Sequence, residues 1–231
     1  MKNINPVFAL ARADEKTLNI YLYDEIESDS YDWWTGELIE SNTSANAIAK
    51  ALDSAGDVEQ INVYINSYGG EVKEGLGIYS QLQRISANVT AFIDGFACSI
   101  ASVIAMAANK VVMNPASLMM IHRAWTVAAG NAEELRKAAD DLEVIDSSIR
   151  SAYLNKVGEK MDEKKLTDLL NSETWLTAQQ CLDYGLCDEI AQPVESNTQK
   201  ELNSAIDNTK QAAIENALRN KLEKMFAAKK S

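Results

Sequence analysis

The amino-acid sequence predicts an α/β fold whose strands are mostly parallel. Residues 61–67 (INVYINS) alternate apolar and polar side chains, as a half-buried strand does. The pair Gly69-Gly70 ends this strand, and an amphipathic helix pattern at 71–85 leads to a second strand pattern at 89–93. A strand, a helix and a following strand in this order form a β-α-β unit, which is right-handed in nearly all proteins.

The same alternation extends in both directions along the chain. On the carboxyl side, a helix is predicted at 99–109 and a strand at 110–113. On the amino side, residues 17–27 alternate as a strand and residues 44–55 have the spacing of a short amphipathic helix. In a fold of this kind, sites form at the carboxyl ends of the strands.

An acidic, aromatic segment at 28–36 (SDSYDWWTG) is predicted to be a loop. Trp33 and Trp34 within it are strongly apolar. We expect them to cover the core or to take part in a subunit contact.

A long helix is predicted at 132–157, after an apolar strand at 117–122 and a loop at 123–131. The helix is longer than one layer of a small domain needs, and its face opposite the apolar stripe is heavily charged. We therefore expect it to project and to contact another subunit.

The remaining elements are short. They are a helix at 162–170, an extended piece at 172–178, a helix at 178–184 that ends at Gly185, and a strand at 186–190.

The expected organisation is one domain over residues 1–192, a linker at 193–199 and an amphipathic helical tail at 200–231. The linker is polar and contains Pro193. From residue 193 onward the chain has seven Lys or Arg and five Asp or Glu, whereas the whole chain has a net charge of −12. The tail is either an interaction helix or a terminal helix packed on its own domain.

Composition excludes several classes of function. Asp and Glu outnumber Lys and Arg by 34 to 22, and no long cluster of basic residues precedes residue 219, so nucleic acid is not an expected partner. No run of 18 apolar residues occurs, and no secretory signal is recognisable, so we expect a cytoplasmic protein without a membrane partner. The three cysteines are expected to be free thiols, and a single histidine makes a metal site improbable. No cofactor is expected.

The stretch 89–110 (VTAFIDGFACSIASVIAMAANK) contains the first candidate site residue, Ser99. The pattern predicts a strand, a tight turn at Asp94-Gly95 and a buried helix, with Ser99 where the helix begins. Free N–H groups and the positive end of a helix dipole would stabilise an anion beside Ser99. The alternative interpretation is a serine that caps a core helix. Cys98 is an alternative nucleophile, but only one of two adjacent residues can face the site.

Hydrolysis of an amide by serine needs a base, an acid that orients the base, and two N–H donors. His122, at the end of a predicted strand, is the single histidine and hence the candidate base, although a lone histidine is often structural. Glu173 is the acidic residue nearest a downstream strand, and the N–H groups of Gly70 and Ile100 are candidate oxyanion donors.

Four motifs, in this order, resemble those of the Clp-type serine peptidase family. They are INSYGG (65–70), DGFACSIAS (94–102), MMIHRAW (119–125) and ETWLTAQQCLDYGLCDEI (173–190). The resemblance is strongest to the Clp-like head maturation proteases of phages and prophages, because of ETWLTA and the helix start GNAEELRKAAD. It implies the roles of nucleophile for Ser99, base for His122, acid for Glu173 and oxyanion donors for Gly70 and Ile100.

The chain departs from the pattern of the housekeeping Clp subunit at three places. Tyr68 occupies the position of a proline, Glu173 stands where an Asp is usual, and residues 1–16 do not match the segment that engages an ATPase partner. Dependence on an unfoldase is therefore not implied by the sequence.

The resemblance also implies a fold and an assembly. The fold would be the spiral of β-α-β units shared with the crotonase group, and the subunits would stack as two rings, usually of seven members. The helix at 132–157 would be the handle that joins the rings, and an extended peptide would pair with the strand before it.

The leading interpretation is a self-compartmentalising serine endopeptidase that cleaves peptides or unfolded proteins. A phage-type enzyme would process a scaffold or capsid protein, and a host-type subunit would work with an AAA+ unfoldase. Two alternatives come from other classes: a crotonase-fold acyl-CoA enzyme, which needs no Ser99-His122 pair, and a catalytically silent assembly protein.

Overall fold

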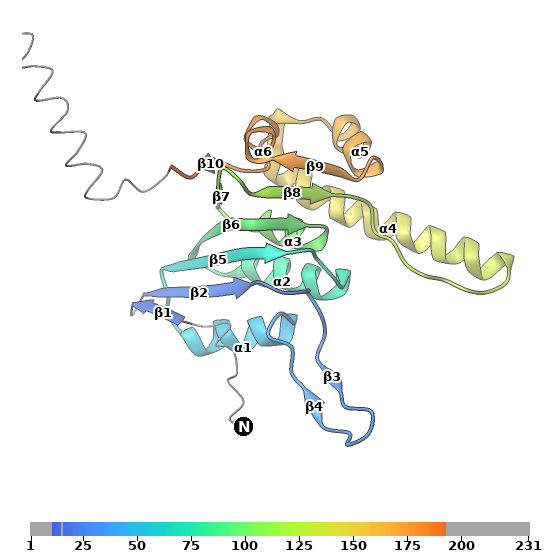
Figure 1. Ribbon diagram of the computed structural model, residues 1–231, viewed down its shortest axis with the longest axis horizontal. Helices are drawn as coiled ribbons and strands as arrows, with labels where there is room; N and C mark the ends of the chain where they lie inside the picture. Colours follow the sequence, from blue (N-terminus) through green and yellow to red (C-terminus); the bar gives the residue numbers. More distant parts are fainter. Residues whose placement is uncertain (1–10, 15, 193–231) are drawn as a thin grey trace, which may run out of the picture. The chain divides into compact units, whose positions relative to one another are not determined.

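The computed structural model describes residues 11–14 and 16–192, and within them it has the predicted α/β architecture (Figure 1). The main sheet follows the order β1-β2-β5-β6-β7-β10, and β8 and β9 extend it as a branch from β6. The pairs β2–β5, β5–β6, β6–β7, β7–β10 and β6–β8 are parallel. Only β1–β2 and β8–β9 are antiparallel pairs of this sheet in the described part of the chain.

The strands are β1 (Ala11–Asp14), β2 (Thr17–Leu22), β3 (Ser30–Tyr31), β4 (Leu38–Ile39), β5 (Gln60–Ser67), β6 (Asn88–Cys98), β7 (Lys110–Met113), β8 (Leu118–Ile121), β9 (Thr174–Thr177) and β10 (Glu189–Ile190). The helices are α1 (Ala45–Ala55), α2 (Val72–Arg84), α3 (Ile100–Ala105), α4 (Ala132–Val157), α5 (Glu163–Asn171) and α6 (Ala178–Tyr184), with a 3-10 turn at Gly158–Lys160. Helix α3 is shorter than the predicted helix at 99–109.

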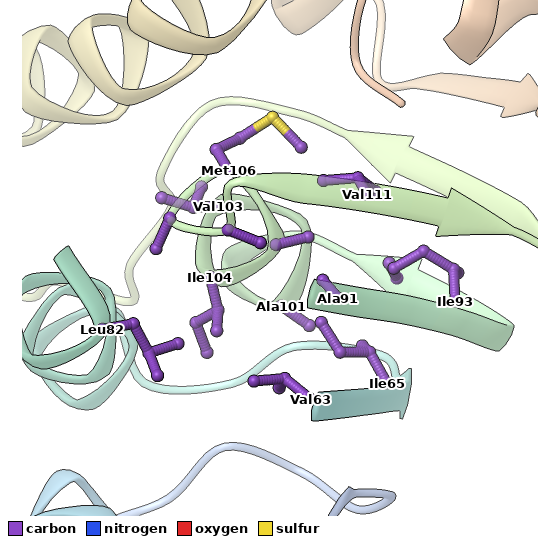
Figure 2. Packing of buried hydrophobic residues seen from close by; sticks show 14 of the residues in the cluster. Val63, Ile65, Leu82, Ala91, Ile93, Ala101, Val103, Ile104, Met106 and Val111 are labelled. Carbon is purple, nitrogen blue, oxygen red and sulfur yellow. The ribbon is translucent and has the colours of Figure 1, made fainter. Parts of the chain in front are cut away.

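The hydrophobic core lies between the sheet and helices α1, α2 and α3. Alternate residues of β2 and β5 are buried, and the parallel register places these residues on one face of the sheet. Figure 2 shows Val63 and Ile65 of β5 beside Ala91 and Ile93 of β6, with Ile104 of α3 packed over them. Each large apolar side chain buried in this way stabilises the fold by about 1.5–3 kcal/mol.

Strand β6 continues past the expected turn at Asp94-Gly95, so that prediction was wrong. The strand pairs with β7 through residues 90–93 and then with β8 through residues 96–98. An irregularity beside β5 accompanies this change of partner. Gly95 permits it, because a Cβ at this position would lie 2.4 Å from the Oδ1 of Asn66. The kinked strand thus ends beside β8.

Helix α4 has the predicted bounds, and all of its buried residues lie in its second half. The buried residues are Asp146, Ile149, Ala152, Tyr153 and Val157. In the first half, Leu135 and Val144 are exposed, and the helix extends away from the sheet (Figure 1). An Asn131 capping box fixes its start.

The segment after β2 contains a short hairpin, β3–β4, where a loop was predicted. Trp33 and Trp34 lie in its turn, with 87% and 79% of their surfaces exposed. They therefore do not cover the core of their own subunit. A subunit contact by these residues remains a prediction.

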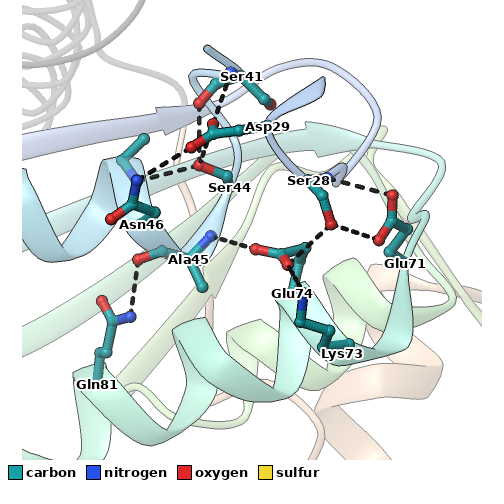
Figure 3. A network of polar contacts seen from close by, with 11 residues as sticks. Ser28, Asp29, Ser41, Ser44, Ala45, Asn46, Glu71, Lys73, Glu74 and Gln81 are labelled. Carbon is teal, nitrogen blue, oxygen red and sulfur yellow. Dashed lines mark hydrogen bonds and ion pairs between the residues drawn. The ribbon is translucent and has the colours of Figure 1, made fainter. Parts of the chain in front are cut away.

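A polar network attaches this segment to the starts of α1 and α2 (Figure 3). The buried carboxylate of Glu74 accepts hydrogen bonds from the N–H of Ala45 at 2.7 Å and from the hydroxyl of Ser28 at 2.9 Å. Asp29 accepts from the N–H of Ser41 and the hydroxyl of Ser44 in the same region. Burial acts to raise the pKa of Glu74, but the hydrogen bonds outweigh it and lower that pKa below its ordinary value.

The compact unit ends at Ala191. The predicted linker at 193–199 and the tail at 200–231 lie outside the described residues. None of the helices described in the structure has the length and apolar character needed to span a membrane.

Candidate active site

Ser99 follows the last residue of β6 and has an unusual backbone conformation. Its φ is 54°, which side-chain-bearing residues rarely adopt, and its N–H donates to the carbonyl of Met120 at 2.8 Å. Cys98 and Met120 are partners in the parallel pair β6–β8. The residues that follow these two strands therefore emerge at the same edge of the sheet.

His122 is one of these residues, one position beyond the end of β8. Its Nε2 lies 2.7 Å from the Oγ of Ser99, which is hydrogen-bond distance. Ser99 is the N-cap residue of α3, but its side chain makes no capping hydrogen bond. The hydroxyl thus faces the imidazole and not the helix, as nucleophilic chemistry would need.

Glu173 immediately precedes β9, which pairs antiparallel with β8. Ile121 is opposite Thr174, so the same register extended by one step would place His122 opposite Glu173. The Glu173 side chain is exposed, and its φ is 47°. Within residues 11–14 and 16–192, no hydrogen bond joins Glu173 to His122. The backbone therefore brings this candidate acid to the same edge of the sheet as His122. The carboxylate of Glu173, however, makes no hydrogen bond to the imidazole of His122.

The loop Gly69-Gly70 lies against Ser99 from the other side. A Cβ at Gly69, whose φ is 103°, would be 2.7 Å from the Cβ of Ser99, so only glycine allows this approach. The carbonyl of Gly69 accepts from the N–H of Ile26 at 2.7 Å, which fixes the loop. In the described part of the chain, the N–H groups of Gly70 and Ile100 have no hydrogen-bond partner. Both candidate donors are thus available.

An ion pair that the sequence analysis did not predict holds the chain just after His122. Asp146 of α4, 2% exposed, accepts from the Nε of Arg123 at 2.5 Å and from the N–H of Ala124 at 2.7 Å. Arg123 also contacts Glu143, and the hydrogen bonds that Arg123 donates to Glu143 and Asp146 raise its pKa. A signal was present, because Asp146 interrupts the apolar stripe of α4 between Leu142 and Ile149.

A second buried contact joins α4 to the serine segment. The hydroxyl of Ser102 donates to the carbonyl of Ser99 at 2.6 Å and lies 2.6 Å from the hydroxyl of Tyr153. Ser102 has one hydroxyl proton, so Tyr153 is the donor of the second bond. Burial raises the pKa of Tyr153, which keeps this hydroxyl protonated.

Cys98, the alternative nucleophile, is fully buried. Burial raises the pKa of its thiol to about 11, although a hydrogen bond from the backbone of Met120 acts in the opposite direction. The thiol is therefore protonated at neutral pH and has no path to a substrate.

Ser99 and His122 open onto a cavity of about 830 Å³. Its wall includes the Gly69-Gly70 loop, Tyr68 and the buried residues Val103, Ile149 and Tyr153. The volume is within the range of small-molecule and peptide pockets. Among the described residues, no three His, Cys, Asp or Glu side chains gather where they could hold a metal ion.

A serine hydroxyl bonded to an imidazole, at the carboxyl ends of neighbouring parallel strands, has the arrangement of a serine-hydrolase site. The Clp protease family matches residues 16–194, so the chain belongs to that family.

Three relatives indicate the extent of the similarity, and each is named ATP-dependent Clp protease proteolytic subunit. The protein of Bacteroides fragilis is 31% identical over 183 residues, which are 77% of this chain and 87% of the relative. The protein of Ligilactobacillus salivarius is 32% identical over 174 residues, 73% of this chain and 86% of the relative. The protein of Deinococcus radiodurans is 30% identical over 168 residues, 71% and 81% of the two chains. Membership of the family supports peptidase activity.

Proposed function

We propose that this protein is a serine endopeptidase that hydrolyses peptides or unfolded polypeptides, with Ser99 as its nucleophile. The observation that carries the proposal is the 2.7 Å contact between the Oγ of Ser99 and the Nε2 of His122, made by a serine that does not cap its helix. A hydroxyl in this position can pass its proton to the imidazole as it attacks a carbonyl carbon.

The chemistry proceeds in two halves. His122 takes the hydroxyl proton, Ser99 forms a bond to the peptide carbonyl, and the N–H groups of Gly70 and Ile100 stabilise the resulting oxyanion. His122 then gives the proton to the leaving amine, and an acyl-enzyme remains. Water attacks this ester with His122 again as base, which releases the acid product and restores Ser99.

Glu173 is proposed as the acid that orients His122. The strand register supports this role, because β8 and β9 lead His122 and Glu173 to the same edge. The exposed carboxylate reaches the Nδ1 of His122 by a side-chain movement, which substrate binding or assembly would favour. Glutamate is one methylene longer than aspartate, so the side chain of Glu173 must retract to orient the same imidazole.

Assembly into two stacked rings, usually of seven subunits, is proposed for the same chain. The exposed first half of α4 supports a handle that contacts a second copy. In that arrangement the sites face an enclosed chamber, which restricts substrates to extended chains. No metal and no cofactor takes part in the proposed mechanism, and the proposed location is the cytoplasm.

We propose two alternative physiological roles for this peptidase. The motif ETWLTA and the start of α4 favour a phage or prophage enzyme that processes a scaffold or capsid protein. The names of the relatives favour a subunit that works with an ATP-dependent unfoldase. Degradation of an unfolded protein by the purified chain, with and without an AAA+ unfoldase and ATP, separates the two.

The test of the catalytic proposal is hydrolysis of internally quenched peptides by the wild type, Ser99→Ala, His122→Ala and Glu173→Gln. The first two substitutions should lower kcat by about 10⁴-fold or more, and the third should lower it less. Equal hydrolysis by wild type and Ser99→Ala would overturn the proposal. An acyl-CoA activity that Ser99→Ala retains would favour the acyl-CoA alternative. No peptidase activity of the wild type under conditions where rings form would favour a silent assembly protein.

A further inference from the structure

Three aromatic side chains from distant parts of the chain form a continuous row beside the candidate active site. Tyr68 lies in the loop after β5, Phe96 in β6 and Trp175 in β9. The ring centroids of Tyr68 and Phe96 are 5.3 Å apart, and those of Phe96 and Trp175 are 5.6 Å apart. Interplanar angles of 63° and 72° make both contacts edge-to-face. We call these three residues the aromatic row.

The aromatic row does not serve the core. Tyr68 is 71% exposed and Trp175 is 48% exposed. On β9 the buried neighbour is Leu176, so Trp175 is on the opposite, open face of the strand. Single exposed aromatic residues are common, whereas a contiguous exposed group is typical of a binding surface.

The position of the row connects it with the nucleophile. Tyr68 precedes Gly69, whose backbone contacts Ser99, and Phe96 is three residues before Ser99 in the chain. Tyr68 and Phe96 also line the cavity that Ser99 and His122 line. The row is therefore an outward continuation of that cavity.

The inner part of the cavity is formed by other residues. Val103, Ile149 and Tyr153 line it and are at most 5% exposed. One side chain of a bound peptide can enter this buried part. A residue next to it along the peptide then reaches the exposed rings, because neighbouring side chains of an extended chain point in different directions.

We propose that the aromatic row is a subsite for polypeptide substrates that selects a large aromatic or branched apolar side chain flanking the cleaved bond. The open faces of Tyr68 and Trp175 accept such a side chain in stacked or edge-to-face contact, and Phe96 holds the two rings in place. Its role in cleavage rests on the proposed peptidase function, whereas its role in peptide binding does not.

The first test measures binding in the full-length Ser99→Ala protein, in which no cleavage occurs. Fluorescent decapeptides of one parent sequence carry a single Phe, which is moved through all positions, and an all-Ala peptide is the reference. We expect at least one Phe position to bind about tenfold more tightly than Ala, a difference of about 1.4 kcal/mol. Tyr68→Ala and Trp175→Ala should reduce that ratio to about threefold or less.

Trp33→Ala is the matched control, because Trp33 is also an exposed tryptophan but lies in the β3–β4 turn. It should leave the Phe-to-Ala ratio unchanged. The ratio is the informative quantity, because a general loss of folded protein lowers binding of both peptides equally.

The second test uses active protein and a small fluorophosphonate probe that is too short to reach the aromatic row. The rate of labelling at Ser99 should be the same in wild type and Trp33→Ala. In Tyr68→Ala the Phe-to-Ala ratio of kcat/KM should fall whatever the labelling rate, because the ratio compares two peptides on the same enzyme. An unlabelled wild type would count against the proposed function alone, since the binding ratio is still measurable. An unchanged Phe-to-Ala ratio in both Tyr68→Ala and Trp175→Ala would overturn the proposed subsite. Loss of assembly in Tyr68→Ala with an unchanged ratio would also overturn it, because that result would mean that a neighbouring subunit covers the aromatic row.

Discussion

The identity of the candidate nucleophile depends on the surroundings of individual side chains, those of Ser99, His122 and Cys98. Ser99 and Cys98 are adjacent, and the sequence cannot tell which of them faces a substrate. The structure separates them by environment, because the Ser99 hydroxyl contacts an imidazole while the Cys98 thiol is buried. Burial and hydrogen bonding, which depend on the folded chain, make this distinction.

The thiol gives a first prediction. Cys98→Ala should retain peptidase activity within about threefold of the wild type, because the substitution removes no group from the cavity. Native protein incubated with iodoacetamide near pH 8 should remain unmodified at Cys98, since the pKa of its thiol is raised to about 11. Peptide mapping by mass spectrometry checks this, with urea-unfolded protein as the positive control. Rapid alkylation of the native protein together with loss of activity would assign the nucleophile to Cys98.

The sequence identified Ser99 and His122 as candidates but could not give their distance. They are 23 residues apart, and their contact follows from the parallel pairing of β6 and β8, which local patterns do not specify. The same limit applies to Glu173. Its strand neighbours were predicted, yet the direction of its side chain depends on a backbone with φ of 47°.

At the scale of elements, α4 supports the segment that follows His122 through Asp146. Sequence periodicity predicted the bounds of α4, because a long amphipathic pattern is a local signal, and the structure shows that Asn131 caps the start of the helix. Periodicity did not give the partner of Asp146, because Arg123 is 23 residues away in the sequence and lies in the loop between β8 and α4.

The second prediction concerns this ion pair. Asp146→Ala should lower the free energy of unfolding by about 1–3 kcal/mol, because Arg123 and the N–H of Ala124 lose a buried acceptor. It should also lower the rate of probe labelling at Ser99, since the chain beside His122 is no longer fixed. Glu143→Gln is the control, because Glu143 contacts the same arginine from an exposed position and should change either quantity little. Equal effects of both substitutions would show that Asp146 does not position His122.

The third prediction concerns Glu74 of α2, whose carboxylate accepts hydrogen bonds from Ala45 at the start of α1 and from Ser28. Its pKa is lower in the folded than in the unfolded chain, so its contribution to stability is complete above the ordinary pKa of a glutamate. That contribution is lost as pH falls through the lowered value. Glu74→Gln should therefore lower Tm at neutral pH, and the difference from the wild type should shrink as the pH falls below about 4.

Thermal unfolding followed by circular dichroism over this pH range makes the comparison. Glu71→Gln is the matched control, because Glu71 also accepts a hydrogen bond from Ser28, from the backbone N–H of that residue, but is exposed. A difference in Tm for Glu74→Gln that stays constant from neutral to acid pH would contradict the account.

At the scale of the whole molecule, the sequence predicted the fold class well, because repeated strand and helix patterns determine a parallel sheet almost uniquely. The sequence predicted the local structure less well at positions whose conformation depends on tertiary contacts. Strand β6 changes partner instead of turning at Gly95, and the segment with Trp33 and Trp34 forms a hairpin that does not cover the core. Both outcomes depend on distant neighbours.

The fourth prediction concerns assembly. Val144, 69% exposed on the projecting half of α4, should lie in the contact between rings. Val144→Glu should therefore halve the native mass of the assembly, because a charge in an apolar interface is costly, while the subunit remains folded. Native mass spectrometry measures this. Val127→Glu is the control, since Val127 is a valine in the loop before α4 that is even more exposed, at 87%. An unchanged mass for Val144→Glu would exclude this part of α4 from the interface.

The central claim is that Ser99 is an activated nucleophile. It is tested most directly by treating the purified wild type and Ser99→Ala with a fluorophosphonate probe, followed by intact-mass measurement and peptide mapping. The account predicts one probe per wild-type subunit, attached at Ser99, and none on Ser99→Ala. Labelling at another residue, or equal labelling of both proteins, would contradict it.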